Sequence, residues 1–200
     1  SLRDKKEHKS ALDIKTVILD ENIEDLFNIH KLVMEDLKAD THSLQVLKGA
    51  EIQHSDLMFD FKDIEKETRA YQYKKFDTFI DQLNKIKEYD YKNGCKSFLH
   101  PNLINLNDNK LLTKDDLIFM NNAKHEPQHF QTCRSPWSSV HVNVDGHLFP
   151  CMAVSMGNVK NKKLNEIIFS DQFKKFKNII RKSGTINGCN RCGILRSKTY

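Results

Sequence analysis

The sequence lacks the segments that mark a membrane or secreted protein. No apolar run approaches the roughly 20 residues that a helix needs to cross a bilayer. The first residues do not show the basic, then apolar, pattern of a signal peptide. We therefore expect a soluble, cytoplasmic protein without a membrane partner. In that reducing compartment, the cysteines are expected to be thiols or metal ligands rather than disulfides.

The sequence also lacks a gathered basic surface. Its net charge is +5, and lysines alternate with acids, as in residues 62–67 (KDIEKE). A nucleic-acid interface needs basic residues grouped on one face with aromatic residues between them. The nearest candidate, residues 173–177 (FKKFK), has its phenylalanines at a spacing typical of a buried helix face. We expect no nucleic-acid partner.

The chain begins at Ser1, and its first methionine is Met34. We interpret this start as typical of a piece of a longer protein. A length of 200 residues corresponds to one ordinary domain or two small ones.

Residues 1–60 are predicted to form an α/β segment. Residues 12–19 (LDIKTVIL) have the apolar, β-branched composition of a buried strand. Asn22 follows as the expected N-cap of a helix over residues 23–37, and a second strand is predicted over residues 41–47. Strand, helix and strand with short connections predict a parallel βαβ unit.

Residues 61–130 are predicted to form a helical connector. Residues 61–92 have the pattern of one long amphipathic helix, and we interpret its aromatic stripe as core. Residues 93–130 are rich in Asn, Asp and His and contain a short helix with Thr113 as its N-cap.

Residues 131–200 are predicted to form a small α+β domain. Valines alternate with polar residues over 140–144, which is typical of a half-buried strand, and Asp145-Gly146 predicts a two-residue hairpin turn. The return strand brings Cys151 back beside the start of the hairpin. The remaining expected elements are a turn at Gly157-Asn158, a helix over residues 164–169, and a helix over residues 171–182 capped by Ser170.

Four cysteines of this region have the spacing C-x17-C and then C-x2-C: Cys133, Cys151, Cys189 and Cys192. Four thiolates complete the ligand set of either a zinc ion or an iron-sulfur cluster. A zinc ribbon usually has two CxxC knuckles, and the opened first pair weakens the zinc interpretation without removing it. Cys95 has no cysteine near it in the sequence and is expected to be a spare thiol.

These cysteines belong to an ordered set of motifs between residues 130 and 195. In chain order the motifs are Cys133-x3-Trp137, residues 139–142 (SVHV), Asp145-Gly146-x3-Pro150-Cys151, Gly157-Asn158, Glu166-Ile167 and Cys189-x2-Cys192. The set resembles the SPASM or twitch domain at the C-terminal end of radical S-adenosylmethionine (SAM) enzymes. The resemblance implies one auxiliary [4Fe-4S] cluster on the four cysteines, because the further cysteines of a second auxiliary cluster are absent.

The N-terminal part is similar to the later βα units of the radical SAM barrel. The similarity covers Thr16-Val17-Ile18-x3-Asn22, the following helix, Asp40-Thr41-His42 and Lys48-Gly49. The family's CxxxCxxC loop, which binds SAM and a second [4Fe-4S] cluster, is absent from the sequence and is expected upstream. The implied fold class is α/β, with a partial (β/α) barrel segment followed by the small α+β SPASM domain. Asn22 becomes a candidate contact for the bound cofactor.

The resemblance implies a role in radical-based oxidation or modification of a peptide, protein or small-alcohol substrate. In the full-length oxidoreductase or maturase, the substrate loses a hydrogen atom to a 5′-deoxyadenosyl radical, and the auxiliary cluster accepts or relays the remaining electron. The chain alone is expected to be inactive, its partner is the missing N-terminal barrel half, and no catalytic residue is assigned. Two alternatives stay open: a zinc-stabilised structural or partner-binding module, and a substrate-recognition domain whose cluster only holds the fold.

Four further residues near the cysteines have two interpretations each, and a fifth, Asp145, has one. His141 and His147 could donate hydrogen bonds to cluster sulfurs, although strand alternation places them toward solvent. Asp145 is expected to be a turn residue. Trp137 is expected to pack over the cluster loop or to form a wall of a substrate pocket. Arg191, inside the CxxC motif, either offsets the negative charge of the cluster or is exposed.

Overall fold

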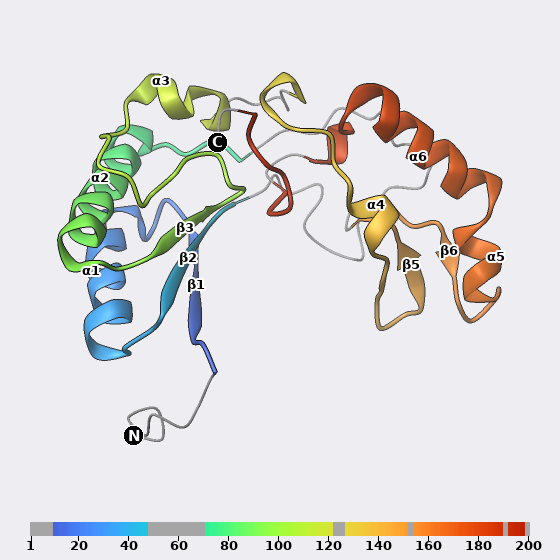
Figure 1. Ribbon diagram of the computed structural model, residues 1–200, viewed down its shortest axis with the longest axis horizontal. Helices are drawn as coiled ribbons and strands as arrows, with labels where there is room; N and C mark the ends of the chain where they lie inside the picture. Colours follow the sequence, from blue (N-terminus) through green and yellow to red (C-terminus); the bar gives the residue numbers. More distant parts are fainter. Residues whose placement is uncertain (1–9, 48–70, 122–126, 152–153, 190–191, 199–200) are drawn as a thin grey trace.

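The structure is a computed structural model that describes residues 10–47, 71–121, 127–151, 154–189 and 192–198 (Figure 1). These residues form two sheets of three strands, each with helices beside it. The first part contains β1 (Asp13–Ile18), α1 (Leu26–Lys31), β2 (Thr41–Val46), α2 (Phe76–Asn93), β3 (Ser97–His100) and α3 (Lys114–Leu117). The second contains α4 (Ser135–Ser138), β4 (His141–Val142), β5 (His147–Phe149), β6 (Gly157–Asn158), α5 (Leu164–Ile168) and α6 (Asp171–Ser183).

The first sheet is parallel, with strand order β1-β2-β3. In its register Ile14 lies beside His42, and Leu44 lies beside both Thr16 and Leu99. The parallel βαβ unit predicted for residues 12–47 is confirmed. Among the described residues the sheet is open and does not close into a barrel.

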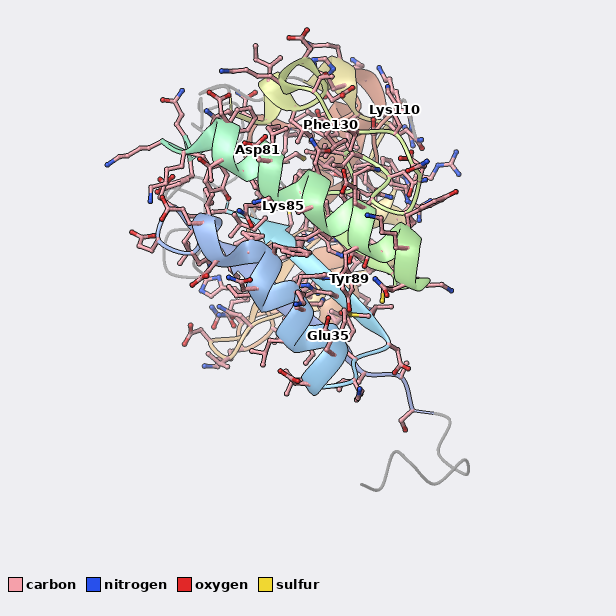
Figure 2. The ribbon with its side chains drawn as sticks, turned by 90° about the vertical axis from the view of Figure 1, so that its left-hand side faces the viewer. Glu35, Asp81, Lys85, Tyr89, Lys110 and Phe130 are labelled. Carbon is pink, nitrogen blue, oxygen red and sulfur yellow. The ribbon has the colours of Figure 1, made fainter. Side chains whose placement is uncertain are left out.

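Two helices cover one face of this sheet (Figure 2). The apolar core between the layers includes Ile18, Leu44, Leu99, Leu26, Phe79, Leu83 and Ile86, all at most 1% exposed. The hydroxyl of Tyr89 on α2 donates to the Glu35 carboxylate at 2.9 Å and so joins α2 to the end of the α1 segment. The opposite sheet face keeps Val17 and Phe98 more than 40% exposed.

The helix after β1 changes its winding along its length. Residues Ile23–Asp25 form a 3-10 turn, α1 follows, and Leu32–Asp36 form a π-helical turn. The predicted helix over residues 23–37 is therefore confirmed as a helical segment. The predicted capping by Asn22 is wrong, because its side chain makes no cap hydrogen bond.

The predicted helix over residues 61–92 is shorter in the structure. It begins at Phe76, residues 71–73 are not helical, and residues 61–70 lie outside the described part. After the left-handed Gly94, the chain forms β3, a parallel strand that sequence reasoning missed. The strand has no clear signal of its own, because its four residues lie in a polar segment of the sequence. It forms by pairing with β2, which is distant along the chain.

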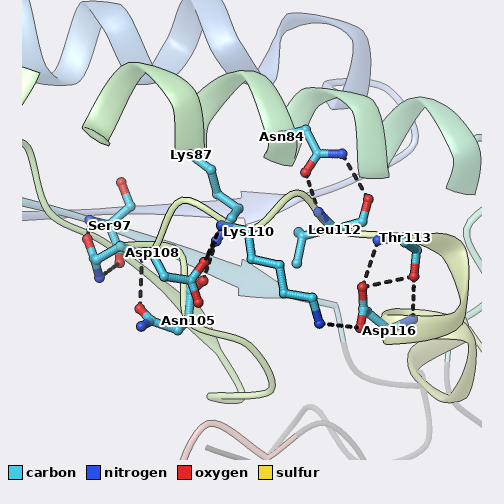
Figure 3. Close-up of polar contacts among 10 residues, drawn as sticks. Asn84, Lys87, Ser97, Asn105, Asp108, Lys110, Leu112, Thr113 and Asp116 are labelled. Atoms are coloured by element: carbon cyan, nitrogen blue, oxygen red, sulfur yellow. Dashed lines mark hydrogen bonds and ion pairs between the residues drawn. The ribbon is translucent and has the colours of Figure 1, made fainter. Parts of the chain in front are cut away.

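The loop after β3 is tied to α2 by polar contacts (Figure 3). The ammonium group of Lys87 donates to the Asn105 carbonyl oxygen and to the Asp108 carboxylate. That hydrogen bond holds the pKa of Asp108 below its usual range. The side-chain amide of Asn84 exchanges two hydrogen bonds with the backbone of Leu112. These contacts fix a loop that has little regular structure of its own.

The N-cap predicted at Thr113 is confirmed. Its hydroxyl accepts from the Asp116 backbone N–H, and the Asp116 carboxylate accepts in return from the Thr113 backbone N–H, which together form a capping box. Ser170 likewise caps α6 through the Phe173 N–H, as predicted.

The second sheet is an antiparallel hairpin with one added strand. The predicted hairpin is confirmed, but its loop has three residues, because Asn143 pairs with His147 and accepts from the Gly146 N–H. Gly146 has a φ of +88°, as in three-residue hairpins that close with a glycine. The predicted turn at Gly157-Asn158 is wrong, since these residues form β6 against β5.

The valines of the hairpin are more exposed than the alternation predicted. Val142 is 49% exposed and Val144, in the loop, is 95% exposed. The buried side chains of this sheet come instead from the return strand, where Leu148 and Phe149 are at most 2% exposed. Alternation predicted the strand and did not predict which of its faces is buried.

The last described residues join the two parts of the molecule. Arg196 forms a parallel bridge with Asn102, just after β3, and Ser197 forms an antiparallel bridge with Phe130. Figure 1 shows this segment passing between the first sheet and the helical second part. In the part of the chain described here, no helix is long and apolar enough to span a bilayer.

Candidate functional site

The first two cysteines lie at the ends of elements of the second part. Cys133 lies two residues before the short helix α4, and its backbone N–H donates to the Gly184 carbonyl oxygen at 2.9 Å. Gly184 ends α6 with a positive φ of 82°. Cys151 follows β5, so the hairpin carries it back toward the start of the sheet. The chain thus places Cys133 beside the end of α6, where the CxxC segment begins.

The second pair lies in tight turns after α6. Asn187–Cys189 form a 3-10 turn, and the Cys192 N–H donates to the Cys189 carbonyl oxygen at 3.0 Å. Leu195 in turn donates to the Cys192 carbonyl oxygen, and its side chain is 3% exposed. Consecutive turns therefore hold both cysteines of the CxxC motif.

The four cysteines border the same apolar core. The thiol of Cys189 is buried, while those of Cys133, Cys151 and Cys192 are partly buried at the edge of that core. All four are free thiols. Among the described residues, no three His, Cys, Asp or Glu side chains are grouped closely enough to hold one metal ion, so their role as a shared ligand set stays a prediction.

Burial dominates the acid-base properties of these thiols. It raises the pKa of Cys189 well above its ordinary value, and the neighbouring thiols of Cys151, Cys192 and Cys133 raise it further. Burial also raises the pKa of Cys133. A ligand that binds thiolates must therefore displace protons from this site and compensate the buried negative charge.

Backbone N–H groups point at two of the sulfurs. The Ile186 N–H donates to Cys189 Sγ at 3.4 Å, and the Ser135 N–H donates to Cys133. Hydrogen bonds to sulfur are among the features that set the potential of iron-sulfur sites. Sequence reasoning missed both donors, because they depend on the turns around the cysteines rather than on residue type.

The donor set fits thiolate-bound metal chemistry. Four thiolates are the ligands of structural zinc sites and of iron-sulfur clusters alike, so the residue types alone do not distinguish the two.

Residues 133–193 match the family model of SPASM, an iron-sulfur cluster-binding domain. This segment is a SPASM domain. The match begins at the first of the four cysteines and ends one residue after the last. No curated protein and no solved structure matches the chain significantly. The predicted resemblance is confirmed, and the iron-sulfur character of the site follows from it.

The hairpin residues of the SPASM domain have local roles. His147 Nδ1 lies 3.0 Å from the Ser155 hydroxyl, and His141 is exposed on β4. Asp145 lies in the hairpin loop, as predicted, and its carbonyl oxygen accepts from the Asn158 side chain. No hydrogen bond from either histidine to a cysteine sulfur is present among the described residues.

Trp137 does not pack in the core of the SPASM domain. Its ring is 42% exposed, and the Arg181 guanidinium lies over it at 5.8 Å from the ring centre. The prediction of core packing is therefore wrong. Arg191 lies outside the described residues.

Asn22 and Cys95 lie in the first part of the molecule. The Asn22 side chain accepts from the Leu19 N–H and donates to the Val17 carbonyl oxygen, both at 2.9 Å, and so closes the loop after β1. Its contact with a cofactor stays a prediction. Cys95 is a free thiol just after α2, as predicted, and the charges that act on it come from Asp90 and Glu35.

Proposed function

We propose that this chain is the C-terminal portion of a radical SAM enzyme that carries one auxiliary [4Fe-4S] cluster. The cluster would be held by Cys133, Cys151, Cys189 and Cys192. The observation that carries this proposal is the match of residues 133–193 to the SPASM model, a segment that contains all four of these cysteines. When bound, such a cluster supplies one-electron transfer.

The protein groups of the site suit an electron-transfer role. Four thiolates give every iron of a four-iron cluster one protein ligand, which leaves no coordination position for a substrate. The N–H groups of Ile186 and Ser135 offset part of the sulfur charge. In the proposed reaction, a 5′-deoxyadenosyl radical would take a hydrogen atom from the substrate, and the cluster held by the four cysteines would supply a one-electron acceptor for the substrate radical that remains. The substrate would be a peptide, a protein or a small alcohol.

The first sheet supports the proposed barrel context. Its strands are parallel, its helices cover one face, and its other face retains exposed apolar side chains such as Val17 and Phe98. A parallel sheet is normally covered on both sides. We infer that the N-terminal half of a barrel, with the SAM-binding CxxxCxxC loop, is the partner of this face. The chain alone is expected not to cleave SAM, because its sequence contains no such loop.

Metal and sulfide analysis of protein purified without oxygen tests the proposal. We expect about four irons and four sulfides per chain, with the broad visible absorption of iron-thiolate clusters. Cys151→Ser should lower the iron content strongly, whereas Cys95→Ser should leave it unchanged, because Cys95 lies apart from the other thiols. One tightly held zinc in a colourless protein would overturn the proposal in favour of a structural or binding module.

A redox titration of the loaded protein separates electron transfer from a purely structural cluster. Electron transfer is supported if the cluster can be reduced reversibly and if Cys151→Ser loses both this reduction and the iron. A cluster that resists dithionite while the fold persists would contradict it and would leave substrate recognition as the role of the domain.

A further inference from the structure

A cavity of about 450 Å³ opens beside the first cysteine of the SPASM domain. Its walls come from two stretches of chain, residues 131–139 around α4 and residues 194–196 near the end of the described chain. Cavities of this size hold small organic ligands. The cavity has no signal in the sequence, because its two walls are more than 50 positions apart along the chain.

Two arginines and several hydroxyl groups line this cavity. The arginines are Arg134 and Arg196, and the hydroxyl residues are Thr132, Ser135, Ser138 and Ser139. Among the described residues that line it, none is acidic. In the described part of the chain, neither guanidinium makes an ion pair or a side-chain hydrogen bond. Both arginines are exposed, so the cavity is lined by two arginines without a carboxylate partner together with neutral hydrogen-bonding residues.

This donor set matches an oxyanion. A guanidinium binds a carboxylate or phosphate group through two parallel N–H···O bonds, and hydroxyl groups can donate to the remaining oxygen lone pairs. A cationic or wholly apolar ligand would leave both arginines without a partner. The lining thus selects ligands by charge and by the planar geometry of the guanidinium.

The cavity lies next to the cluster site. Cys133 itself lines it, and the Ser135 N–H that donates to the Cys133 sulfur belongs to the same wall. Leu195, on the other wall, donates its N–H to the Cys192 carbonyl oxygen. Both walls therefore continue directly into cysteine-bearing turns.

We propose that this cavity binds an oxyanion group, a carboxylate or a phosphate, of the substrate, and that Arg134 and Arg196 hold that group. Its assignment to the substrate rests on the proposed function of the cluster. The binding site itself rests on the cavity and its charges alone.

Calorimetric titration of the cluster-loaded chain with succinate and, separately, with inorganic phosphate tests the proposal. Ionic strength is kept constant with chloride, because exposed charges are screened by salt. We expect saturable binding that Arg134→Gln and Arg196→Gln each weaken by about tenfold or more, the loss that follows from removing a charge-assisted hydrogen bond. Arg134→Lys should retain part of the affinity, because the charge stays and the fork is lost.

Lys175→Gln is the matched control, since it removes one positive charge from an exposed position on α6 that does not line the cavity. Equal weakening by Lys175→Gln, or no binding of either anion, would overturn the site. Tighter binding of succinate assigns it to a carboxylate, and tighter binding of phosphate assigns it to a phosphate group. If the chain holds zinc and binds an anion, the binding site is supported and the proposed function is contradicted. If the chain holds four irons and binds neither anion, the proposed function is supported and the binding site is overturned.

Discussion

At the residue scale, four polar side chains form a buried hydrogen-bonded chain between the first sheet and its helices. The Thr16 hydroxyl lies 2.9 Å from His42 Nε2, His42 Nδ1 lies 2.9 Å from His30 Nδ1, and His30 Nε2 lies 2.9 Å from Asp90 Oδ1. With both rings neutral, every contact is satisfied if Thr16 donates to His42, His42 donates to His30, and His30 donates to the Asp90 carboxylate. A further proton on His42 Nε2 would reverse the contact with Thr16, whose hydroxyl oxygen would then accept.

This arrangement predicts a pH-dependent stability. Burial and the neighbouring His30 lower the pKa of His42 from 6.5 to about 4, against the opposing charges of Asp90 and Asp13. The unfolded chain therefore binds a proton more readily than the folded one between these two values. The contribution of His42 is complete above pH 6.5 and is lost as the pH falls toward 4. It amounts to about 1.4 kcal/mol for each unit by which the pKa is lowered.

Urea denaturation at pH 7.5 and at pH 5 measures this contribution. In His42→Asn, which keeps a hydrogen-bonding side chain and cannot titrate, the drop in unfolding free energy between the two pH values should be smaller than in the parent chain. An equal drop in both proteins would assign the pH dependence to other groups.

At the scale of single elements, the hairpin of the SPASM domain depends on one glycine. Gly146 has a positive φ, and a Cβ atom there would lie 2.7 Å from the Asn158 side-chain oxygen. Gly146→Ala should therefore cost the strain of the left-handed region, about 1–2 kcal/mol, and the displacement of Asn158 in addition. Because Asn158 belongs to β6, this change should loosen the pairing that carries Cys151.

Gly94→Ala supplies the control for this substitution. Gly94 also has a positive φ, but no atom would lie within 4 Å of an added Cβ. Thermal unfolding should show a larger destabilisation for Gly146→Ala than for Gly94→Ala, and iron retention should fall only in Gly146→Ala. Equal losses of stability would show that the contact with Asn158 is easily relieved.

The elements that could be predicted from the sequence are those with a local cause. The caps at Thr113 and Ser170 were predictable because a cap depends on residues three positions apart. Strand β3 was not, because its four residues form a strand only when β2 is beside them. The exposure of Val142 shows the same limit, since alternation identifies two faces and tertiary packing decides which one is buried.

The cysteines of the candidate site could be predicted from the sequence, whereas the groups that surround them could not. The spacing of the cysteines is read directly from the sequence, and it predicted the segment that matches the SPASM model with four candidate ligands in it. The N–H donors of Ile186 and Ser135, and the cavity between Arg134 and Arg196, depend on turns and on chain segments that meet only in the folded state.

At the scale of the whole molecule, the segment after the CxxC motif connects the two sheets. Backbone hydrogen bonds join it on one side to Asn102, behind β3, and on the other to His129 and Gln131 at the entrance to the SPASM domain. A methyl group added at Gly193 would approach the side chains of Gln45 and His100. The cysteine site is therefore fixed against the carboxyl ends of β2 and β3.

Truncation of one side chain in this segment tests its role. Leu195 is 3% exposed and belongs to the core, so Leu195→Ala should lower the unfolding free energy by about 2–4 kcal/mol. The adjacent Ile194 is 49% exposed, and Ile194→Ala should cost less than about 1 kcal/mol. Urea denaturation compares the two variants. Similar costs would show that this segment is not essential to the packing between the two parts.

The wide separation of the cysteines along the chain has a consequence for the order of assembly. Cys133 and Cys192 are 59 positions apart, and the hairpin, α5 and α6 lie between them. Closing so long a loop costs conformational entropy, which the packing of those elements must offset first. A growing chain presents only Cys133 and Cys151 of the four until α6 has been made. If these cysteines hold the proposed cluster, complete loading would come after α6 and would report that the intervening elements have packed.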